Sequence, residues 1–351
     1  MAATVAVVGM PGSRGVEAAL RACAVAGVTA APVGDPAQLA RVWRSATAAI
    51  VVVSAAAWVS GLPRRASVAV LDDAAGSELD AWRLAVQLGA ETVFEPSADP
   101  RTLVDWLALA GEPAGPPGLV IGVAGACGGA GASTLAAALA LRAGSSSMLV
   151  DADPSGGGID VLLGVEGTAG TRWPDLRASR GVVAADVLAG AVLRVDGVAV
   201  VSWMAGDVAP APVEAMDAVL SAAIRGSDLV VVDLPRGVDA AAEHAAARCD
   251  RILLVVPASV RAVAAASAAV ARWSSAGTDL GLVVRHPGPA DLTPAAVTDA
   301  VGLPLLGVVP ADPRLANLGD RGRFVQGLRR SPVGAAAEAI GSRLHATREA
   351  A

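Results

Sequence analysis

The chain has 351 residues, enough for about two domains of ordinary size. Hydrophobic residues make up 54% and charged residues only 17%, which supports a large packed core and excludes a mostly disordered chain. With a net charge of -6, no global basic field draws the protein toward nucleic acid or anionic lipid.

Residues 4–110 alternate short apolar runs with amphipathic stretches. The apolar runs predict strands at 4–8, 28–33, 49–54, 68–72 and 91–96. The amphipathic stretches predict helices at 15–27, 36–46, 78–90 and 99–111. This alternation indicates a parallel α/β sheet in a first domain at 1–110.

The order of these elements resembles a response-regulator receiver domain, but the receiver's chemical residues are missing. Gly9, Met10 and Pro11 follow the first strand, where a receiver carries acidic residues. Ser54 lies near the phosphoacceptor position, and Glu95-Pro96 takes the place of the receiver's Lys-Pro pair. Without the carboxylates there is no Mg²⁺ site and no aspartyl-phosphate. We expect a pseudo-receiver used for contacts, with an unrelated α/β domain as the alternative.

A glycine- and proline-rich segment at 111–118, GEPAGPPG, predicts a linker. Beyond it the alternation resumes, and seven apolar runs predict strands at 119–125, 146–153, 198–203, 229–235, 251–257, 280–285 and 303–310. We expect one doubly wound, mostly parallel sheet in a second domain at 119–345, followed by a tail at 346–351. The fold class is therefore α/β, with a larger sheet domain after a smaller one.

The sequence GACGGAGAST, residues 125–134, joins a predicted strand to a predicted helix. Its small residues let successive backbone N–H groups converge on an anion, and the helix adds its positive end. The Ser133 hydroxyl is suited to a Mg²⁺ held between phosphates, but Ala132 stands where a phosphate loop usually carries lysine. Lysine is absent from the whole chain. Tight packing between strand and helix is the plain alternative.

Aspartates follow two further predicted strands. Asp151 ends the strand at 146–153, Asp153 follows it, and Asp160 opens a short helix. Asp233 ends the apolar run of DLVVVDLPRG. Carboxylates at this edge of a parallel sheet can hold Mg²⁺ or orient an attacking water, although Asp is also a common turn former.

Together the three motifs resemble the MinD/ParA superfamily of P-loop ATPases, whose loop follows the pattern K-G-G-x-G-K-[ST]-T. Gly128, Gly129, Gly131, Ser133 and Thr134 match this pattern. Cys127 replaces the superfamily's signature lysine, Ala132 replaces its phosphate-binding lysine, and Ala130 occupies the variable position.

The resemblance implies ATP and Mg²⁺ as cofactors, bound by residues 127–134. It also implies Ser133, Asp151 and Asp233 around the metal, and Asp153 orienting a water. Arg285 stands where the superfamily often has a base-reading Asn, and Pro310 lies in the segment expected near the adenine.

A receiver-like domain before a MinD-like domain is similar to the CpaE-like pilus-assembly proteins and to the actinobacterial septum-site-determining (Ssd) proteins. That similarity implies a cytoplasmic regulator of septum placement, or of a pilus or secretion machine, acting through protein partners. Recruitment to the septum or pole through those partners, and a homodimer, are open candidates.

The missing lysines predict weak or absent hydrolysis. A charged hydrogen bond to phosphate contributes roughly 1.5–3 kcal/mol, so losing one weakens binding by about one to two decades. A cation placed against the transition state is worth roughly 10³–10⁵ in rate. The protein is therefore at most a weak ATPase, and a pseudo-ATPase scaffold acting through protein contacts is the first alternative.

A dinucleotide-binding enzyme and a redox sensor have weaker support. Gly129-x-Gly131 followed by Asp151 partly fits the dinucleotide-binding fingerprint, but Thr134 occupies the third glycine position. The sensor residue would be Cys127, although three distant cysteines without a CxxC fit a reducing cytosol.

Neither DNA nor the membrane surface is expected as a direct partner. The local candidates for DNA binding are Arg321, Arg323, Arg329 and Arg330, but the acidic total and the lack of a longer basic run disfavour it. The C-terminal segment is Ala-rich with mixed charges, which disfavours direct membrane anchoring.

Overall fold

The computed structural model describes residues 4–59, 62, 65, 67–73, 78–110, 117–179, 182–204, 206, 209–237, 239–274, 277–286 and 292–349. The chain divides into two compact units. The first comprises Met1–Gly115 with Gly181–Ala184, and the second comprises Pro116–Arg180 with Ala185–Ala351. Most of the linker expected at 111–118 lies outside the described residues.

The first unit is a five-stranded parallel sheet with strand order β2-β1-β3-β4-β5. Its strands are β1 (Thr4–Val8), β2 (Thr29–Val33), β3 (Ala48–Val52), β4 (Val68–Leu71) and β5 (Thr92–Phe94). Its helices are α1 (Arg14–Ala26), α2 (Pro36–Ser45), α3 (Glu78–Leu88) and α4 (Pro100–Ala110), with a 3₁₀ helix η1 (Val53–Val59) after β3. This strand order is that of receiver domains, so the predicted topology is confirmed.

Near the strand ends of this unit, where a receiver has a cluster of acidic residues, a serine is hydrogen-bonded to an aspartate. Ser54, in η1, donates its hydroxyl hydrogen to Oδ2 of Asp73 at 2.7 Å. Among the described residues no group of three or more His, Cys, Asp or Glu side chains is placed to hold a metal ion.

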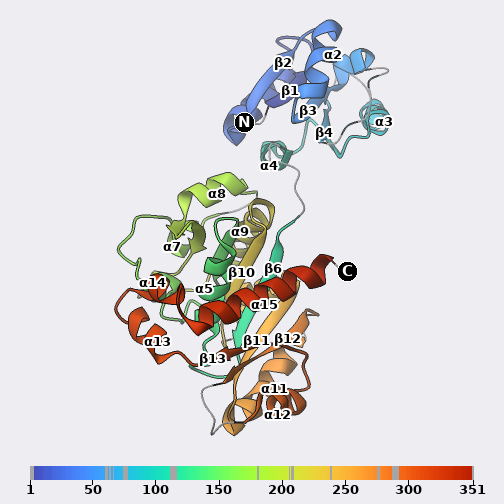
Figure 1. Cartoon of the computed structure of the whole chain (residues 1–351). Helices are drawn as coiled ribbons and strands as arrows, with labels where there is room; N and C mark the ends of the chain where they lie inside the picture. Colours follow the sequence, from blue (N-terminus) through green and yellow to red (C-terminus); the bar gives the residue numbers. More distant parts are fainter. Residues whose placement is uncertain are drawn as a thin grey trace. The chain divides into compact units, whose positions relative to one another are not determined.

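The second unit is built on an eight-stranded sheet of order β13-β12-β11-β6-β10-β7-β9-β8. Figure 1 labels five of these strands, β6, β10, β11, β12 and β13. Its strands are β6 (Leu119–Gly125), β7 (Ser147–Asp151), β8 (Leu193–Val195), β9 (Val198–Val201), β10 (Leu229–Leu234), β11 (Arg251–Pro257), β12 (Asp279–His286) and β13 (Leu305–Pro310). All neighbouring strands are parallel except β8 and β9. The predicted α/β fold with a mostly parallel sheet is confirmed.

Strand β8 was not predicted. It pairs with β9 through a turn at Asp196 and Gly197, which have φ of +52° and +90°. Asp-Gly is the sequence signal of such a two-residue hairpin turn, so the signal was present in the chain.

The helices of the second unit cover both faces of this sheet. They are α5 (Ala132–Ala143), α6 (Ile159–Leu163), α7 (Trp173–Leu176), α8 (Ala185–Ala191), α9 (Val213–Gly226), α10 (Ala240–Ala247), α11 (Val260–Ser274), α12 (Pro294–Val301), α13 (Pro313–Gly319), α14 (Phe324–Leu328) and α15 (Pro332–Glu349). The last helix continues four residues past the expected domain end at 345.

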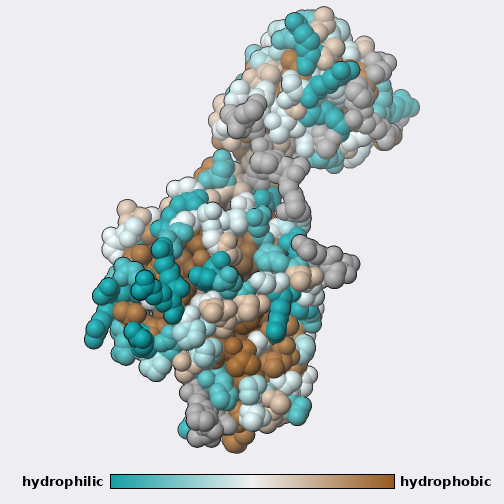
Figure 2. All heavy atoms as spheres, viewed as in Figure 1, coloured by the Kyte–Doolittle hydropathy of each residue, from teal (hydrophilic) through white to brown (hydrophobic). Residues whose placement is uncertain are grey.

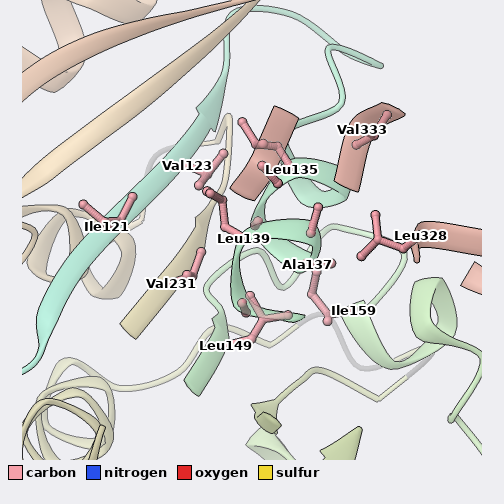
Figure 3. Packing of buried hydrophobic residues seen from close by; sticks show 14 of the residues in the cluster. Ile121, Val123, Leu135, Ala137, Leu139, Leu149, Ile159, Val231, Leu328 and Val333 are labelled. Carbon is pink, nitrogen blue, oxygen red and sulfur yellow. The ribbon is translucent and has the colours of Figure 1, made fainter. Parts of the chain in front are cut away.

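The main core lies between the sheet and α5. Alternate residues of β6, Ile121 and Val123, point to the same side as Val231 of β10, because side chains alternate along a strand (Figure 3). Leu135 and Leu139 of α5 pack against them (Figure 3). This packing fixes the first turn of α5 against the end of β6, where the predicted phosphate loop lies.

Candidate functional site

The connection from β6 to α5 is a tight glycine loop. Gly129 and Gly131 have φ of +69° and +92°, a left-handed conformation that side chains disfavour. Gly131 is the N-cap of α5, and no side chain caps this end of the helix. The first amides of α5 therefore lack a side-chain acceptor, as in a helix end that binds an anion.

The loop opens onto a cleft of about 260 Å³. The cleft is lined by loop residues, by the start of α5 and by residues that follow β7 and β10: Gly125, Cys127, Gly129, Ala130, Gly131, Ala132, Ser133, Thr134, Asp153, Asp233, Leu234 and Arg236. The structure thus brings together most of the residues singled out in the sequence.

Ser133 and Asp233 are in direct contact in this cleft. The Ser133 side chain is hydrogen-bonded to the Asp233 carboxyl, which is 4% exposed at the end of β10. A hydroxyl and a carboxylate are the oxygen donors that Mg²⁺ prefers, so these two residues fit a metal held beside a phosphate. Because the described residues provide no larger cluster, such a metal would need phosphate and water oxygens to complete its shell.

Asp151 lies beneath the cleft and is absent from its lining. Its two carboxyl oxygens accept hydrogen bonds from the backbone amides of Asp153 at 3.1 Å and Ile159 at 3.0 Å. Its own carbonyl accepts a hydrogen bond from the Trp173 indole at 2.6 Å. Asp151 therefore holds the segment that carries Asp153, and Asp153 is the member of this motif that reaches the cleft.

Burial dominates the titration of the two aspartates under the loop. It raises the pKa of Asp151 to about 7, although backbone hydrogen bonds from Asp153 and Ile159 oppose the shift. Burial, followed by repulsion from Asp151, raises the pKa of Asp233 well above its usual range, and the hydrogen bond from Ser133 opposes this. A cation in the cleft would stabilise the charged forms of both.

Cys127 and Ala132, which stand in place of the two lysines, are partly buried. Cys127 and Ala132 line the cleft and also pack against the hydrophobic cluster around α5. No basic residue occurs in 125–134, so any positive side chain in the cleft must come from elsewhere.

Arg236 is such a side chain, and sequence reasoning missed it. It lies two residues after β10 in the DLPRG motif and lines the cleft. A methyl group placed on Gly128 would lie 3.6 Å from the Cζ and Nη1 atoms of Arg236. The sequence signal for Arg236 was its place just beyond the end of β10, the strand that neighbours β6.

A second, larger pocket of about 710 Å³ adjoins the cleft, and both are lined by Gly131 and Thr134. Arg285 of β12 and Pro310 of β13, the two residues predicted near the base, both line it. Arg285 also donates from Nη1 to the carbonyl oxygen of Gly129 at 3.0 Å. It therefore contacts the loop as well as the larger pocket.

The basic residues considered for DNA binding are partly engaged within the protein. Arg329 forms an ion pair with Asp196 at 2.8 Å, and Arg323 donates to Gln326 at 3.0 Å. Figure 2 shows many hydrophilic side chains over the region that Figure 1 labels α13 and α14.

Helix α15 turns an apolar face inward, with Val333, Ala337, Ile340 and Leu344 in the core. This face is therefore occupied by packing against the protein's own core. Within the described parts of the chain, no helix has the length and apolarity needed to cross a membrane.

Two comparisons relate the chain to known sequences. The model of the CheY-like N-terminal domain of the Rv3660c-like family matches residues 14–118. Two proteins from strains of Mycobacterium tuberculosis, "Uncharacterized protein Rv3660c" (H37Rv) and "Uncharacterized protein MT3760" (CDC 1551), are each 40% identical over 306 residues. Those alignments cover 84% of this chain and 85% of each relative.

Solved structures resemble the second unit in fold. A MinC:MinD cell division protein complex from Aquifex aeolicus matches with a TM-score of 0.54 and 20% identity, over 65% of this chain and 96% of that chain. The septum site-determining protein MinD from Pyrococcus horikoshii, complexed with Mg-ADP, gives 0.50 and 20%, over 64% and 95%. A ParA family ATPase from Chlorobium tepidum gives 0.53 and 16%, over 64% and 98%. At these identities the likeness shows the fold.

Proposed function

The chain belongs to the Rv3660c-like family, and from this premise we propose that its second unit is a nucleotide-binding switch with weak or no ATP hydrolysis. In this proposal the switch regulates septum placement, or a pilus or secretion machine, through protein partners. One observation carries it: a glycine loop, the Ser133–Asp233 contact and Asp153 converge on a single cleft beside a larger pocket.

The two cavities suit the two halves of a nucleotide. The 260 Å³ cleft has the backbone amides and the helix end that bind phosphate. The adjoining 710 Å³ pocket, which holds Arg285 and Pro310, is of a size that ordinarily accepts a small organic ligand. We place the phosphates in the cleft, Mg²⁺ beside Ser133 and Asp233, and the base in the larger pocket.

The neighbours' own ligands support this placement. The Pyrococcus horikoshii MinD was solved with Mg-ADP, and the Aquifex aeolicus MinD was solved with a protein partner, MinC. We extend to this chain both the ligand class and the mode of action through a bound protein. A member of the septum-site-determining group would regulate septum placement, whereas a member of the CpaE-like group would regulate a pilus or secretion machine.

Weak turnover follows from the loop itself. Ala132 and Cys127 supply no charge against the transferring phosphate, so the transition state loses a stabilisation of roughly 10³–10⁵ in rate. Asp153 is left to orient a water without that help. A scaffold that has lost nucleotide altogether is the competing function, and the same absence of lysine favours it.

A dinucleotide enzyme is disfavoured by the position of Asp151. That fingerprint needs an acidic side chain that reaches a ribose, whereas Asp151 is 2% exposed and accepts two backbone hydrogen bonds.

Calorimetric titration of the full chain with Mg-ATP and Mg-ADP tests the switch against the scaffold. We expect a dissociation constant above about a micromolar and slow phosphate release. No binding at millimolar nucleotide would support the scaffold, whereas tighter binding with robust turnover would contradict the weak-hydrolysis proposal. Cell length and pili, scored in a deletion strain, would separate division from pilus control.

A further inference from the structure

Two arginines approach the phosphate loop from opposite sides of strand β6, Arg236 in the phosphate cleft and Arg285 in the adjoining pocket. In the strand order, β10 is the direct neighbour of β6 on one side, and β12 lies two strands away on the other. Arg236 follows β10 and Arg285 lies near the end of β12, so both reach the edge where the loop leaves β6. We infer that Arg236 and Arg285 supply, from the same chain, the positive charge that the loop lacks, and that they bind the polyphosphate of the nucleotide. This inference rests on the proposed nucleotide function.

Arg236 is placed for an external anion. Its side chain is exposed, and in the described part of the chain its guanidinium has no hydrogen bond or ion pair. Its backbone is held: Arg272 of α11 donates to the carbonyl of Arg236 at 2.5 Å and also to that of Gly237. A fixed backbone with a free guanidinium over Gly128 is the arrangement expected of a phosphate-binding arginine.

Arg285 is attached to the loop itself. Its Nη1 donates to the Gly129 carbonyl, and a methyl group on Gly131 would lie 3.5 Å from its Cδ. Its Nε atom is buried and, among the described residues, has no hydrogen-bond partner. An unsatisfied buried donor is costly.

The positive groups around the loop favour an anion in the cleft. The Arg236 side chain and the positive end of α5 lie in the cleft, whose wall also carries Asp153 and Asp233, and Arg285 contacts the loop at Gly129 from the adjoining pocket.

The test compares Mg-ATP, Mg-ADP, inorganic tripolyphosphate and adenosine, titrated into the full-length protein. We expect Arg236→Ala and Arg285→Ala each to weaken binding of the three phosphate ligands about ten- to a hundred-fold, and Arg236→Lys to weaken it less. Adenosine binding should not change in Arg236→Ala, because Arg236 lines only the phosphate cleft.

The matched control is Arg142→Ala. Arg142 is in the last turn of α5, about 15 Å from the loop at the helical rise, and forms an ion pair with Glu338. The Arg142→Ala variant removes one positive charge from the same unit, and we expect its affinities for all four ligands to equal those of the wild type. Thermal melting of each variant within a few degrees of wild type shows that the fold is intact.

Restoring the loop lysine gives an independent readout. If the arginines replace that lysine, Ala132→Lys should recover affinity in the Arg236→Ala/Arg285→Ala background by more than it improves the wild type. Arginines that only support the fold would give equal effects in both backgrounds.

The outcomes separate this inference from the proposed function. Nucleotide binding that is unchanged in the double arginine variant overturns the inference and leaves the function standing. Arginine-dependent binding of tripolyphosphate, without binding of ATP or ADP, overturns the function and, with it, the assignment of the arginines to a nucleotide. A wild type that binds none of the phosphate ligands overturns both.

Discussion

Asp151 and Asp233 are register partners on the adjacent parallel strands β7 and β10, and both side chains are buried, Asp233 on the wall of the phosphate cleft and Asp151 outside its lining. Burial raises the pKa of each, and repulsion from Asp151 raises that of Asp233 further. Two acidic groups in one buried place are stable when protons or a cation neutralise them. The pair therefore links the stability of the apo protein to pH.

In metal-free buffer, we expect the free energy of unfolding to fall as pH rises from about 5 to about 8. The folded protein holds protons on Asp151, whose pKa is about 7, at pH values where the unfolded chain has released them. The protonated Asp151 side chain therefore contributes to stability at low pH, and this contribution is lost as pH rises. The free energy of unfolding falls by at most about 1.4 kcal/mol per pH unit for each proton released. Urea unfolding at several pH values measures the slope.

Asp151→Asn should flatten this slope, because an amide does not titrate. The control is Asp299→Asn, at an exposed position on α12, which should keep the wild-type slope. A stability that increases over this pH range would contradict the assigned burial of the pair.

Among the three cysteines, Cys127 should be the one that reacts with thiol reagents in the native protein. Cys23 and Cys249 are 1% and 7% exposed, and burial raises the pKa of Cys23 to about 11 and that of Cys249 well above its usual value. Since the thiolate is the reactive form, both should be inert at neutral pH, whereas Cys127 lines the cleft.

A chromogenic disulfide reagent should therefore titrate one thiol in the native protein and three in the denatured protein. Cys127→Ser should abolish the native reaction, and saturating Mg-ATP should slow it by covering the loop. Rapid labelling of two thiols, or labelling unaffected by nucleotide that calorimetry shows to bind, would contradict this geometry.

The sequence predicted the elements well because their signals are local. Apolar runs such as 229–235 are buried on both faces of the sheet, and glycines at 129 and 131 occupy left-handed positions. The same local signals placed Asp153 and Asp233 at strand ends, where parallel topology brings them to one edge.

What the sequence missed depends on strand order and register. Arg285 contacts Gly129, 156 positions earlier, because β12 and β6 flank the same neighbour, β11. Alternation of strands and helices does not define that order. Of the two aspartates in the DADP motif, Asp153 lines the cleft and Asp151 does not, and the metal role of Asp151 stays a prediction.

Ala132→Lys should tighten Mg-ATP binding about ten- to a hundred-fold in the wild-type background, since Ala132 lines the phosphate cleft. Turnover should stay slow, because Cys127 still occupies the position of the second lysine. Calorimetry and phosphate release measure the two effects separately. The control Ser342→Lys adds the same charge at an exposed position of α15 and should change neither affinity nor turnover. A loss of affinity in Ala132→Lys would contradict the proposed phosphate position.

The segment under the acidic motif is held by a buried ion pair. Arg172 donates from Nε to Oδ2 of Asp160 at 2.7 Å, and the two side chains are 10% and 2% exposed. The remaining guanidinium hydrogens go to four backbone carbonyls, those of Val165, Glu166, Thr168 and Gly170. This network fixes the loop that follows α6.

Arg172→Ala should lower the free energy of unfolding by about 3–5 kcal/mol, because it leaves the Asp160 carboxylate buried without its ion-pair partner. The matched control is Arg251→Ala, which breaks the more exposed pair with Asp279 in the same unit and should cost less than about 1 kcal/mol. Since the amide of Ile159, next to Asp160, donates to Asp151, nucleotide affinity should fall in Arg172→Ala and stay unchanged in Arg251→Ala. Equal stability losses in the two variants would show that burial does not set the strength of this pair.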